Sequence, residues 1–361
     1  MPTSFAIGTL AQLLDRSQEW YLPGLNNAIY TGRGPLVLLF YDGFELKAME
    51  GIAGAAYSRA RWAARFIVRN VRRAQVWTGF YTAFRGLCTC LRQVGCDVRV
   101  NNFTLARRHP RYPIGLVGYP SGLTQVRLPN PTLLGPGDFG FPDATASLAR
   151  EARFRRMIQA CPWSADLYRP HWGEKMFVWP VGIDTNAWPD LSAVPKSIDV
   201  LLYDKIRWDR DRVLPRVRWR VEEHLKRRGL SCRVVEYGKH HLSTYAHLLR
   251  QSRVMIFLCE HEAQGLACQE AMSCNVPVLA WDEGVLVDPQ QQRFAGPELV
   301  VTSIPYFDRR CGERFKLNEF EDVFSEFWSK RDDYRPRQYV LEHLSYTGAA
   351  QSYLEAYSIL M

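Results

Sequence analysis

Short apolar runs alternate with longer amphipathic segments in the C-terminal half of the chain. Five runs of four to six residues have the length and composition of buried strands: 199–203, 232–237, 254–258, 276–281 and 299–302. The segments near 211–228, 242–251 and 266–274 have the length and polarity of helices. Strands joined by helices form right-handed β-α-β units, so this pattern predicts an α/β domain with a parallel sheet.

The N-terminal half shows the same alternation less regularly. Strands are predicted at 36–41, 97–100, 114–117 and 176–179, and the Pro- and Gly-rich segment 107–143 is predicted to form loops between short strands. Prolines interrupt regular structure near 182–197. We therefore expect two Rossmann-like, doubly wound domains that face a cleft, 1–185 and 186–335, followed by a helical tail, 336–361.

The composition is that of a soluble globular protein. Of 361 residues, 47% are hydrophobic and 23% are charged, and no apolar run approaches the roughly 18 residues of a membrane helix. Charged residues among 15–19 interrupt the apolar core that a signal peptide needs. Nine cysteines without a metal-ligand spacing predict reduced, mostly buried thiols in a cytoplasmic protein.

Positive charge is concentrated in the N-terminal half. The net charge is +9: residues 1–180 contribute +11 (22 Lys and Arg against 11 Asp and Glu), and residues 181–361 contribute −2 (24 against 26). This asymmetry predicts an anionic partner for the first half, which leaves a phosphate-bearing substrate, a membrane surface and a nucleic acid open.

Two glutamates, Glu262 and Glu270, stand eight positions apart after the predicted strand 254–258. In a parallel sheet this turn lies at the ligand-binding edge, and a helix that begins near Leu266 offers backbone N–H groups that suit phosphate. Gly265 lets a ligand approach the backbone closely. Glu270, one turn into the helix, is placed to accept hydrogen bonds from a ribose diol. The pattern predicts a nucleotide-sugar site, and the alternative is a surface turn with incidental acids.

Residues 262–278, Glu-Ala-Gln-Gly-Leu-Ala-Cys-Gln-Glu-Ala-Met-Ser-Cys-Asn-Val-Pro-Val, resemble the E-x7-E signature of retaining GT-B glycosyltransferases of family 4, the glycosyl transferases group 1. Residues 179–185, Trp-Pro-Val-Gly-Ile-Asp-Thr, are similar to a second family segment. The resemblance implies that Glu262 contacts the donor sugar, that Glu270 holds the ribose and that the last helix crosses back to the N-terminal domain. Gln264 departs from the family pattern, and we expect it to affect which sugar fits.

The resemblance also implies cations for a diphosphate after the strand 199–203. The family has an Arg and, five residues later, a Lys at this point; here Lys205 and Arg210 keep both charges and the spacing. Arg207 is a competing candidate. The alternative for the whole segment is a solvated run of charges.

Further site residues are implied with less support from the sequence. Gly79 would approach the diphosphate or the acceptor, although a helix-start glycine without a ligand fits equally well. The acceptor-side histidine of the family has no counterpart, and Asp138 is the nearest polar candidate. Gly238 and Lys239, after the predicted strand 232–237, would touch the nucleotide base through their backbone.

Arginines recur every fourth residue along one predicted helix: Arg61, Arg65, Arg69 and Arg73. Trp62 and Phe66 fall on another side of it. The favoured interpretation is a helix docked by its aromatic residues with a solvated basic face, and the alternative is peripheral contact with an anionic membrane. No nucleic-acid-binding motif accompanies the charge, so no nucleic acid partner is expected.

These observations predict a cytoplasmic hexosyltransferase, peripheral on the inner face of the membrane if the helix binds there. As the resemblance implies, it would be retaining and metal-independent, with a nucleotide-diphosphate sugar as its donor substrate and no cofactor. The acceptor would be a glycan or lipid-linked glycan in surface polysaccharide synthesis. Two alternatives stay open: a non-catalytic nucleotide-sugar-binding protein and a basic membrane-associated protein on the same scaffold. A Rossmann dehydrogenase is disfavoured because no G-x-G-x-x-G follows any predicted strand.

Overall fold

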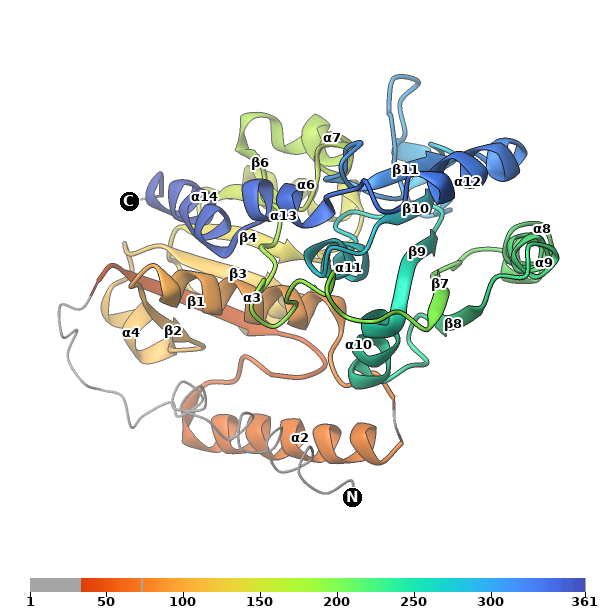
Figure 1. The fold of residues 1–361 in the computed structure, drawn as a ribbon. Helices are drawn as coiled ribbons and strands as arrows, with labels where there is room; N and C mark the ends of the chain where they lie inside the picture. Colours follow the sequence, from red (N-terminus) through yellow and green to blue (C-terminus); the bar gives the residue numbers. More distant parts are fainter. Residues whose placement is uncertain (1–33, 73, 361) are drawn as a thin grey trace, which may run out of the picture.

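The computed structural model describes residues 34–72 and 74–360 and contains two parallel sheets (Figure 1). The first sheet has the order β2-β1-β3-β4-β5-β6. Its strands are β1 (Leu36–Asp42), β2 (Asp97–Val100), β3 (Ile114–Gly118), β4 (Thr132–Gly137), β5 (Phe154–Gln159) and β6 (Met176–Val178). The accompanying helices are α2 (Gly51–Val71), α3 (Gly79–Gln93), α4 (Phe103–Arg108), α5 (Ser121–Gln125), α6 (Pro142–Arg150) and α7 (Pro162–Trp172).

The second sheet has the order β11-β10-β9-β7-β8. Its strands are β7 (Ile198–Asp204), β8 (Cys232–Glu236), β9 (Ser252–Leu258), β10 (Val278–Trp281) and β11 (Gly312–Phe315). The helices that follow them are α8 (Arg210–Arg216), α9 (Arg218–Arg227), α10 (Leu242–Gln251), α11 (Leu266–Ser273), α12 (Phe320–Ser329), α13 (Pro336–His343) and α14 (Tyr346–Ser358).

Both sheets are buried on two faces. Every residue of β1 after Leu36 is buried, and in β9 only Arg253 is exposed. Continuous apolar runs of this kind are typical of parallel strands that helices cover on both sides. Two hydrophobic clusters form around each sheet, one on each side of it. The predicted fold class, α/β with two Rossmann-like units, is confirmed.

The last helix returns to the first sheet, as Figure 1 shows for α14 beside α3. The backbone N–H of Leu38 donates to the hydroxyl of Tyr357 at 3.0 Å. The indole N–H of Trp179 donates to the carbonyl of Ala349 at 2.8 Å. Since these partners are buried, α14 completes the core of the first sheet although the whole second sheet precedes it in the chain.

Several predicted elements need correction. The strand expected at 299–302 is wrong: Asp282 accepts hydrogen bonds from the Thr302 hydroxyl (2.6 Å) and the Ser303 N–H (3.0 Å), and these bonds hold the segment as a loop. β11 pairs with β10 instead. The prediction also missed β4 and β5. Two of the predicted helices are divided in two, 211–228 at Val217 and the tail at Leu344 and Ser345.

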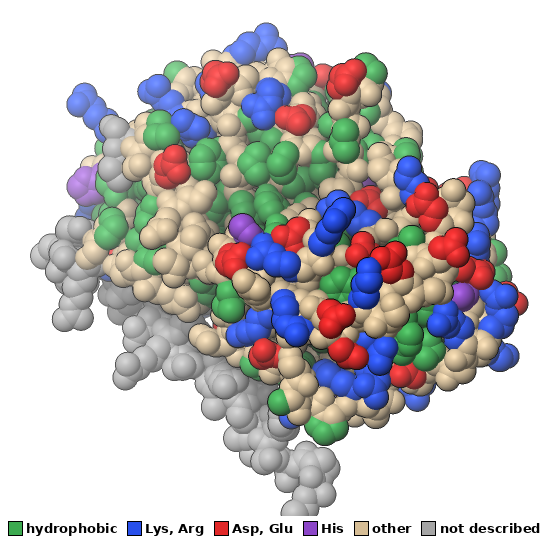
Figure 2. Space-filling model, turned by 45° about the horizontal axis from the view of Figure 1, so that its top comes forward, with side chains coloured by type: hydrophobic (Ala, Val, Ile, Leu, Met, Phe, Trp, Pro, Cys, Tyr) green, Lys and Arg blue, Asp and Glu red, His purple; other side chains and the backbone are tan. Residues whose placement is uncertain are grey.

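Charges of both signs are mixed over the second sheet's side of the molecule. Figure 2 shows basic and acidic side chains interspersed over the right-hand part of the surface, where α8, α9 and α12 lie in Figure 1. Arg227 pairs with Glu321 at 3.1 Å and Arg218 with Glu222 at 3.3 Å, which agrees with the balanced charge of this half. In the part of the chain that the structure describes, no helix has the length and apolarity needed to cross a membrane.

Candidate functional site

The loop 259–265 joins the end of β9 to α11 at the carboxyl edge of the second sheet. Gly265 has a left-handed backbone (φ +75°) directly before α11, a conformation that favours glycine. The N–H of Glu262 donates to the carbonyl of Thr302 at 3.0 Å, so the 299–302 loop supports this turn. The first turn of α11, which begins four residues after Glu262, has backbone N–H groups without helical acceptors.

Lys205 follows β7, the neighbour of β9, and its ammonium donates to the carboxylate of Glu262. The two side chains are 15% and 12% exposed. Burial opposes both charges, but the mutual attraction raises the pKa of Lys205 and lowers the pKa of Glu262. The ammonium also lies 4.6 Å from the ring centroid of Tyr237. The pair is therefore ionised in a nearly dry position.

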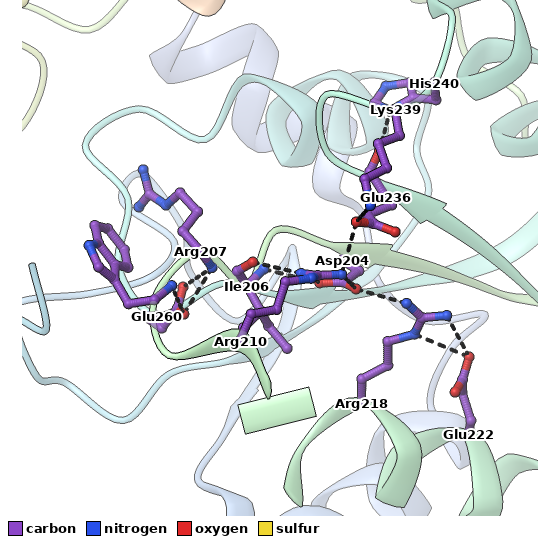
Figure 3. Close-up of polar contacts among 11 residues, drawn as sticks. Asp204, Ile206, Arg207, Arg210, Arg218, Glu222, Glu236, Lys239, His240 and Glu260 are labelled. Carbon is purple, nitrogen blue, oxygen red and sulfur yellow. Dashed lines mark hydrogen bonds and ion pairs between the residues drawn. The ribbon is translucent and has the colours of Figure 1, made fainter. Parts of the chain in front are cut away.

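Arg207 lies next to this ion pair. Its guanidinium donates to the carbonyl of His261 and stands 4.2 Å from the ring centroid of Trp208. The carboxylate of Glu260 accepts from the backbone N–H group of Arg207 at 3.0 Å, as Figure 3 shows, and from that of Trp208 at 3.1 Å. Glu260 thereby ties the loop after β7 to the loop after β9 and holds the Arg207 cation beside Glu262.

Arg210 points to a different group of residues. It donates to the two carboxylate oxygens of Asp204 at 3.0 and 2.6 Å and lies 3.1 Å from Glu236 (Figure 3). Arg218 also donates to Asp204 at 3.0 Å. Asp204 is completely buried, so these cations compensate its charge. Lys205 therefore contacts Glu262 in the structure, whereas Arg210 contacts Asp204 and not Glu262.

Glu270 is half-buried one turn into α11. Within 34–72 and 74–360, no residue donates a hydrogen bond to its carboxyl group or pairs with it, and burial raises its pKa to about 8. A carboxyl group that loses water without gaining a donor costs free energy. Its position suits a ligand that supplies hydroxyl donors.

Residues that follow strands of the first sheet hold the loop 259–265 from the other side. The N–H of Val181 donates to the side-chain oxygen of Gln264 at 2.9 Å, and the side-chain amide of Gln264 donates to that of Gln269 at 2.6 Å. The indole of Trp163, in the first turn of α7, donates to the carbonyl of Glu262 at 3.1 Å. Gln264 therefore bonds to the chain segment between the two sheets.

The remaining predicted donor residues belong to α11 and to the turn after β8. Leu266 packs against hydrophobic clusters of both sheets. Gly238 (φ +79°) and Lys239 are exposed in the turn after β8, and Lys239 pairs with Glu236 at 2.6 Å. A side chain at Gly238 would meet no atom within 4 Å, so the backbone there is open to a ligand.

Gly79 and Asp138 belong to the carboxyl edge of the first sheet. Gly79 is the exposed first residue of α3, and a side chain there would meet no atom within 4 Å. Asp138 is exposed directly after β4 and accepts from the N–H of Gly140 at 3.0 Å. Neither residue contacts Glu262 through a hydrogen bond or ion pair in the described structure.

Three aromatic side chains gather at the same edge. The ring of Tyr119, after β3, is 5.0 Å from that of Phe44 and 5.3 Å from that of Phe80, edge to face in both cases. Phe44 is 53% exposed and Phe80 is 36% exposed.

Two short motifs need comment. Gly135 and Gly140 bound a G-x-G-x-x-G segment, but its first three residues lie within β4, so the segment does not follow a strand as a dinucleotide-binding motif does. A side chain at Gly135 would lie 2.8 Å from the carbonyl oxygen of Ile158, and one at Gly137 would clash with the Gly118 carbonyl. Contacts between strands thus explain these glycines. An Asp-x-Asp triplet, 209–211, opens α8, and its Asp209 pairs with Arg212 at 3.3 Å.

Sequence reasoning missed four aromatic residues of the site. Tyr237 ends the predicted strand 232–237 and Trp208 lies in the loop after β7, and these positions at the carboxyl ends of strands could have indicated them. Trp163 and Tyr119 come from the first sheet, and the approach of Trp163 to the second sheet depends on how the two units pack. No local sequence signal reports that packing.

Comparison with known proteins shows that part of the second unit is similar to one protein family. The model of the glycosyl transferases group 1 matches residues 218–292, which include Glu262, Gly265 and Glu270. No curated protein matches the chain.

Three solved structures share the fold over nearly their whole length. Sucrose-phosphate synthase from Thermosynechococcus elongatus is 13% identical with a TM-score of 0.55, and the match covers 91% of this chain and 99% of that one. AviGT4, a glycosyltransferase involved in avilamycin A biosynthesis, is 11% identical with a TM-score of 0.50 and coverages of 90% and 98%. The lipopolysaccharide outer core galactosyltransferase WaaB is 8% identical with a TM-score of 0.50 and coverages of 90% and 100%.

The fold is that of the GT-B glycosyltransferases. Together with the family match over 218–292, it confirms the predicted resemblance to group 1 glycosyltransferases.

Proposed function

We propose that this protein transfers a sugar from a nucleotide-diphosphate sugar to a glycan or lipid-linked acceptor. The observation that supports this most directly is Glu270, a half-buried carboxyl group without a donor among the described residues, one turn into a helix that starts four residues after Glu262. A ribose would supply the two missing hydroxyl donors. Its diphosphate would then lie toward the first turn of α11, where backbone N–H groups and the helix dipole favour negative charge.

The cations of the site have a role in this reaction. Lys205 and Arg207 are the basic side chains beside Glu262, and a diphosphate leaving group needs positive charge as the bond to the sugar breaks. We infer that Arg207 takes the role that sequence spacing gave to Arg210, because Asp204 and Glu236 already bind Arg210. The proposed transfer retains the anomeric configuration and needs no metal, with the leaving phosphate taking the acceptor proton.

The acceptor would bind at the carboxyl edge of the first sheet. Phe44, Phe80 and Tyr119 offer apolar ring faces and edges there, which suit a sugar ring or the apolar part of a lipid-linked glycan. Asp138 is the polar candidate at this edge. Such an acceptor would fit a role in surface polysaccharide synthesis, in the cytoplasm at the inner face of the membrane.

Nucleotide binding is the first test. Thermal unfolding would be followed with UDP, GDP and several of their sugars, for the wild type, Glu270→Ala and the matched control Glu298→Ala, an exposed glutamate. At 100 times the dissociation constant, a ligand stabilises the folded state by about 2.7 kcal/mol. We expect stabilisation by one nucleotide in the wild type and the control, and its loss in Glu270→Ala. Absence of stabilisation by every nucleotide would contradict the proposal.

A non-catalytic nucleotide-sugar-binding protein is the second candidate. It is favoured by the acceptor edge, where Asp138 is exposed and no histidine stands in the segment 133–139. Incubation with the stabilising nucleotide sugar, followed by NMR of the released sugar, separates the two candidates. Slow hydrolysis with a retained anomer supports the transferase, and an intact donor under saturating conditions supports the binding protein.

A further inference from the structure

Helix α2 lies outside the first sheet, and among residues 34–72 and 74–360 it packs against the molecule along one side (Figure 1). Trp62 and Phe66 stack with each other and with Trp77, with ring centroids 5.5 to 5.8 Å apart. The predicted docking by aromatic residues is thus observed. The arginine spacing predicted that the remaining side of the helix would be basic, and the structure differs from that prediction.

The row of arginines lies toward the protein and not in solvent. Three of its members are half-buried and interact with neighbouring groups: Arg61 with the carbonyl of Phe44 (3.4 Å), Arg65 with the carboxylate of Glu45 (3.7 Å) and Arg69 with the carbonyl of Gln75 (2.8 Å). The fourth, Arg73, lies outside the described residues. The expectation of a solvated basic face on this helix is therefore wrong.

The solvent-facing side of α2 is apolar over its full length. Every exposed residue of the helix is hydrophobic or glycine, and the larger ones are Ile52 (79% exposed), Tyr57 (55%), Ile67 (61%), Val68 (46%) and Val71 (78%). With about 100° between successive residues, these side chains and the exposed alanines fall on roughly half of the helix circumference. A continuous exposed apolar face of this size marks an interaction surface.

Positive charge borders this face. Arg59 flanks it on the helix and Arg72 follows the last turn, and neither side chain has a hydrogen bond or ion pair among the described residues. The helix has no acidic residue between Gly51 and Val71. An apolar stripe bordered by arginines is complementary to a layer with an anionic surface and an apolar interior.

We propose that this face of α2 docks in the plane of an anionic lipid surface. A second copy of the chain is a poorer occupant, because two such helices would bring arginines together without an acid to pair them. A nucleic acid is also a poorer occupant, because it needs arginines and not an apolar stripe. The 21-residue helix is about 31 Å long and would lie in the interface, with its axis parallel to the membrane.

Vesicle flotation with the full chain tests the proposal. The vesicles are phosphatidylcholine alone and a mixture of phosphatidylcholine with phosphatidylglycerol in which roughly one lipid in four is anionic. The variants are Ile67→Glu and Val71→Glu, with Val300→Glu as the matched control, since Val300 is 81% exposed in the second unit. We expect binding to the anionic vesicles, weakened about 10-fold or more by each α2 variant and unchanged in the control.

Every other outcome overturns the proposal. These outcomes are absence of wild-type binding to anionic vesicles, equal binding by Ile67→Glu, and a lipid-free dimer that Ile67→Glu dissociates in sedimentation velocity. The α2 substitutions replace exposed side chains, so an unchanged unfolding temperature shows that each variant is folded. Glu270→Ala should bind vesicles as the wild type does, so a failed nucleotide test and a failed membrane test remain distinguishable.

Discussion

Lys205 and Glu262 form a nearly dry ion pair between the carboxyl ends of two neighbouring strands, β7 and β9. In-register pairing of Asp204 with Leu258 brings the two loops together, and Glu260 fixes them by accepting from Arg207. The groups proposed to meet the diphosphate and the sugar therefore neutralise each other in the free protein. A bound diphosphate would have to draw Lys205 partly away from Glu262.

Removing one partner of this pair should destabilise the protein more than removing both. Lys205→Met leaves the Glu262 carboxylate buried without its main cation, and breaking a buried pair in this way costs about 3–5 kcal/mol. We expect the double variant Lys205→Met/Glu262→Gln to recover more than half of that loss. Urea unfolding of the two single variants and the double variant gives the coupling free energy. Additive effects would show that the pair is not a coupled unit.

Glu270 should make folding stability fall as the pH rises. Its pKa is raised from 4.5 to about 8, so between these values the native state binds a proton that the unfolded state has lost, and stability declines until about pH 8. Glu270→Gln removes this effect. We expect the variant to gain more than about 1.4 kcal/mol over the wild type at pH 8.5, and much less at pH 5. Thermal unfolding between these pH values measures the difference, and parallel curves would contradict the raised pKa.

The same carboxyl group should make nucleotide affinity depend on pH in the opposite direction. Ribose hydroxyls donate to the ionised form, so wild-type affinity should increase with pH and level off above about 8. Glu270→Gln should bind weakly without this dependence. Calorimetric titration of the nucleotide identified by thermal unfolding checks the prediction at each pH. The Glu298→Ala control should follow the wild-type profile.

Local patterns predicted the second sheet better than the first. The strands β7, β9 and β10 are mostly buried apolar runs. The glycine before α11 permits the left-handed turn there, so the sequence indicated the Glu262 and Glu270 region at the correct edge. The sequence analysis missed β4 because it contains Gly135 and Gly137, and glycines are typical of loops. Here the short distances to neighbouring strands leave no room for a side chain at either position. The approach of Trp163 to Glu262 depends on packing between the two units, which no local pattern encodes.

The sequence spacing alone did not identify the second cation of the diphosphate site. Arg210 is five residues after Lys205, but the buried Asp204 draws it away from the site. We expect Arg207→Ala to weaken nucleotide-diphosphate binding by at least 10-fold, about 1.4 kcal/mol, with a small effect on stability. Arg210→Ala should mainly lower stability, since it leaves Asp204 with Arg218. Nucleotide titration and urea unfolding of both variants separate the roles, and the reverse result would restore Arg210 as the diphosphate ligand.

Phe44 and Phe80 should contribute to binding of the acceptor and not to binding of the nucleotide-sugar donor. Their exposed rings meet Tyr119 at the edge of the first sheet, and each ring that stacks on a sugar or an apolar chain contributes about 1 kcal/mol. Phe80→Ala and Phe44→Ala should therefore raise the KM for the acceptor several-fold, while nucleotide affinity stays at the wild-type value. Phe80→Tyr keeps the ring and serves as the matched control. Initial rates at saturating donor, with acceptor varied, measure the effect. If both alanine variants kept the wild-type KM, the acceptor would have to bind elsewhere on the first sheet, with Asp138 as the next residue to test.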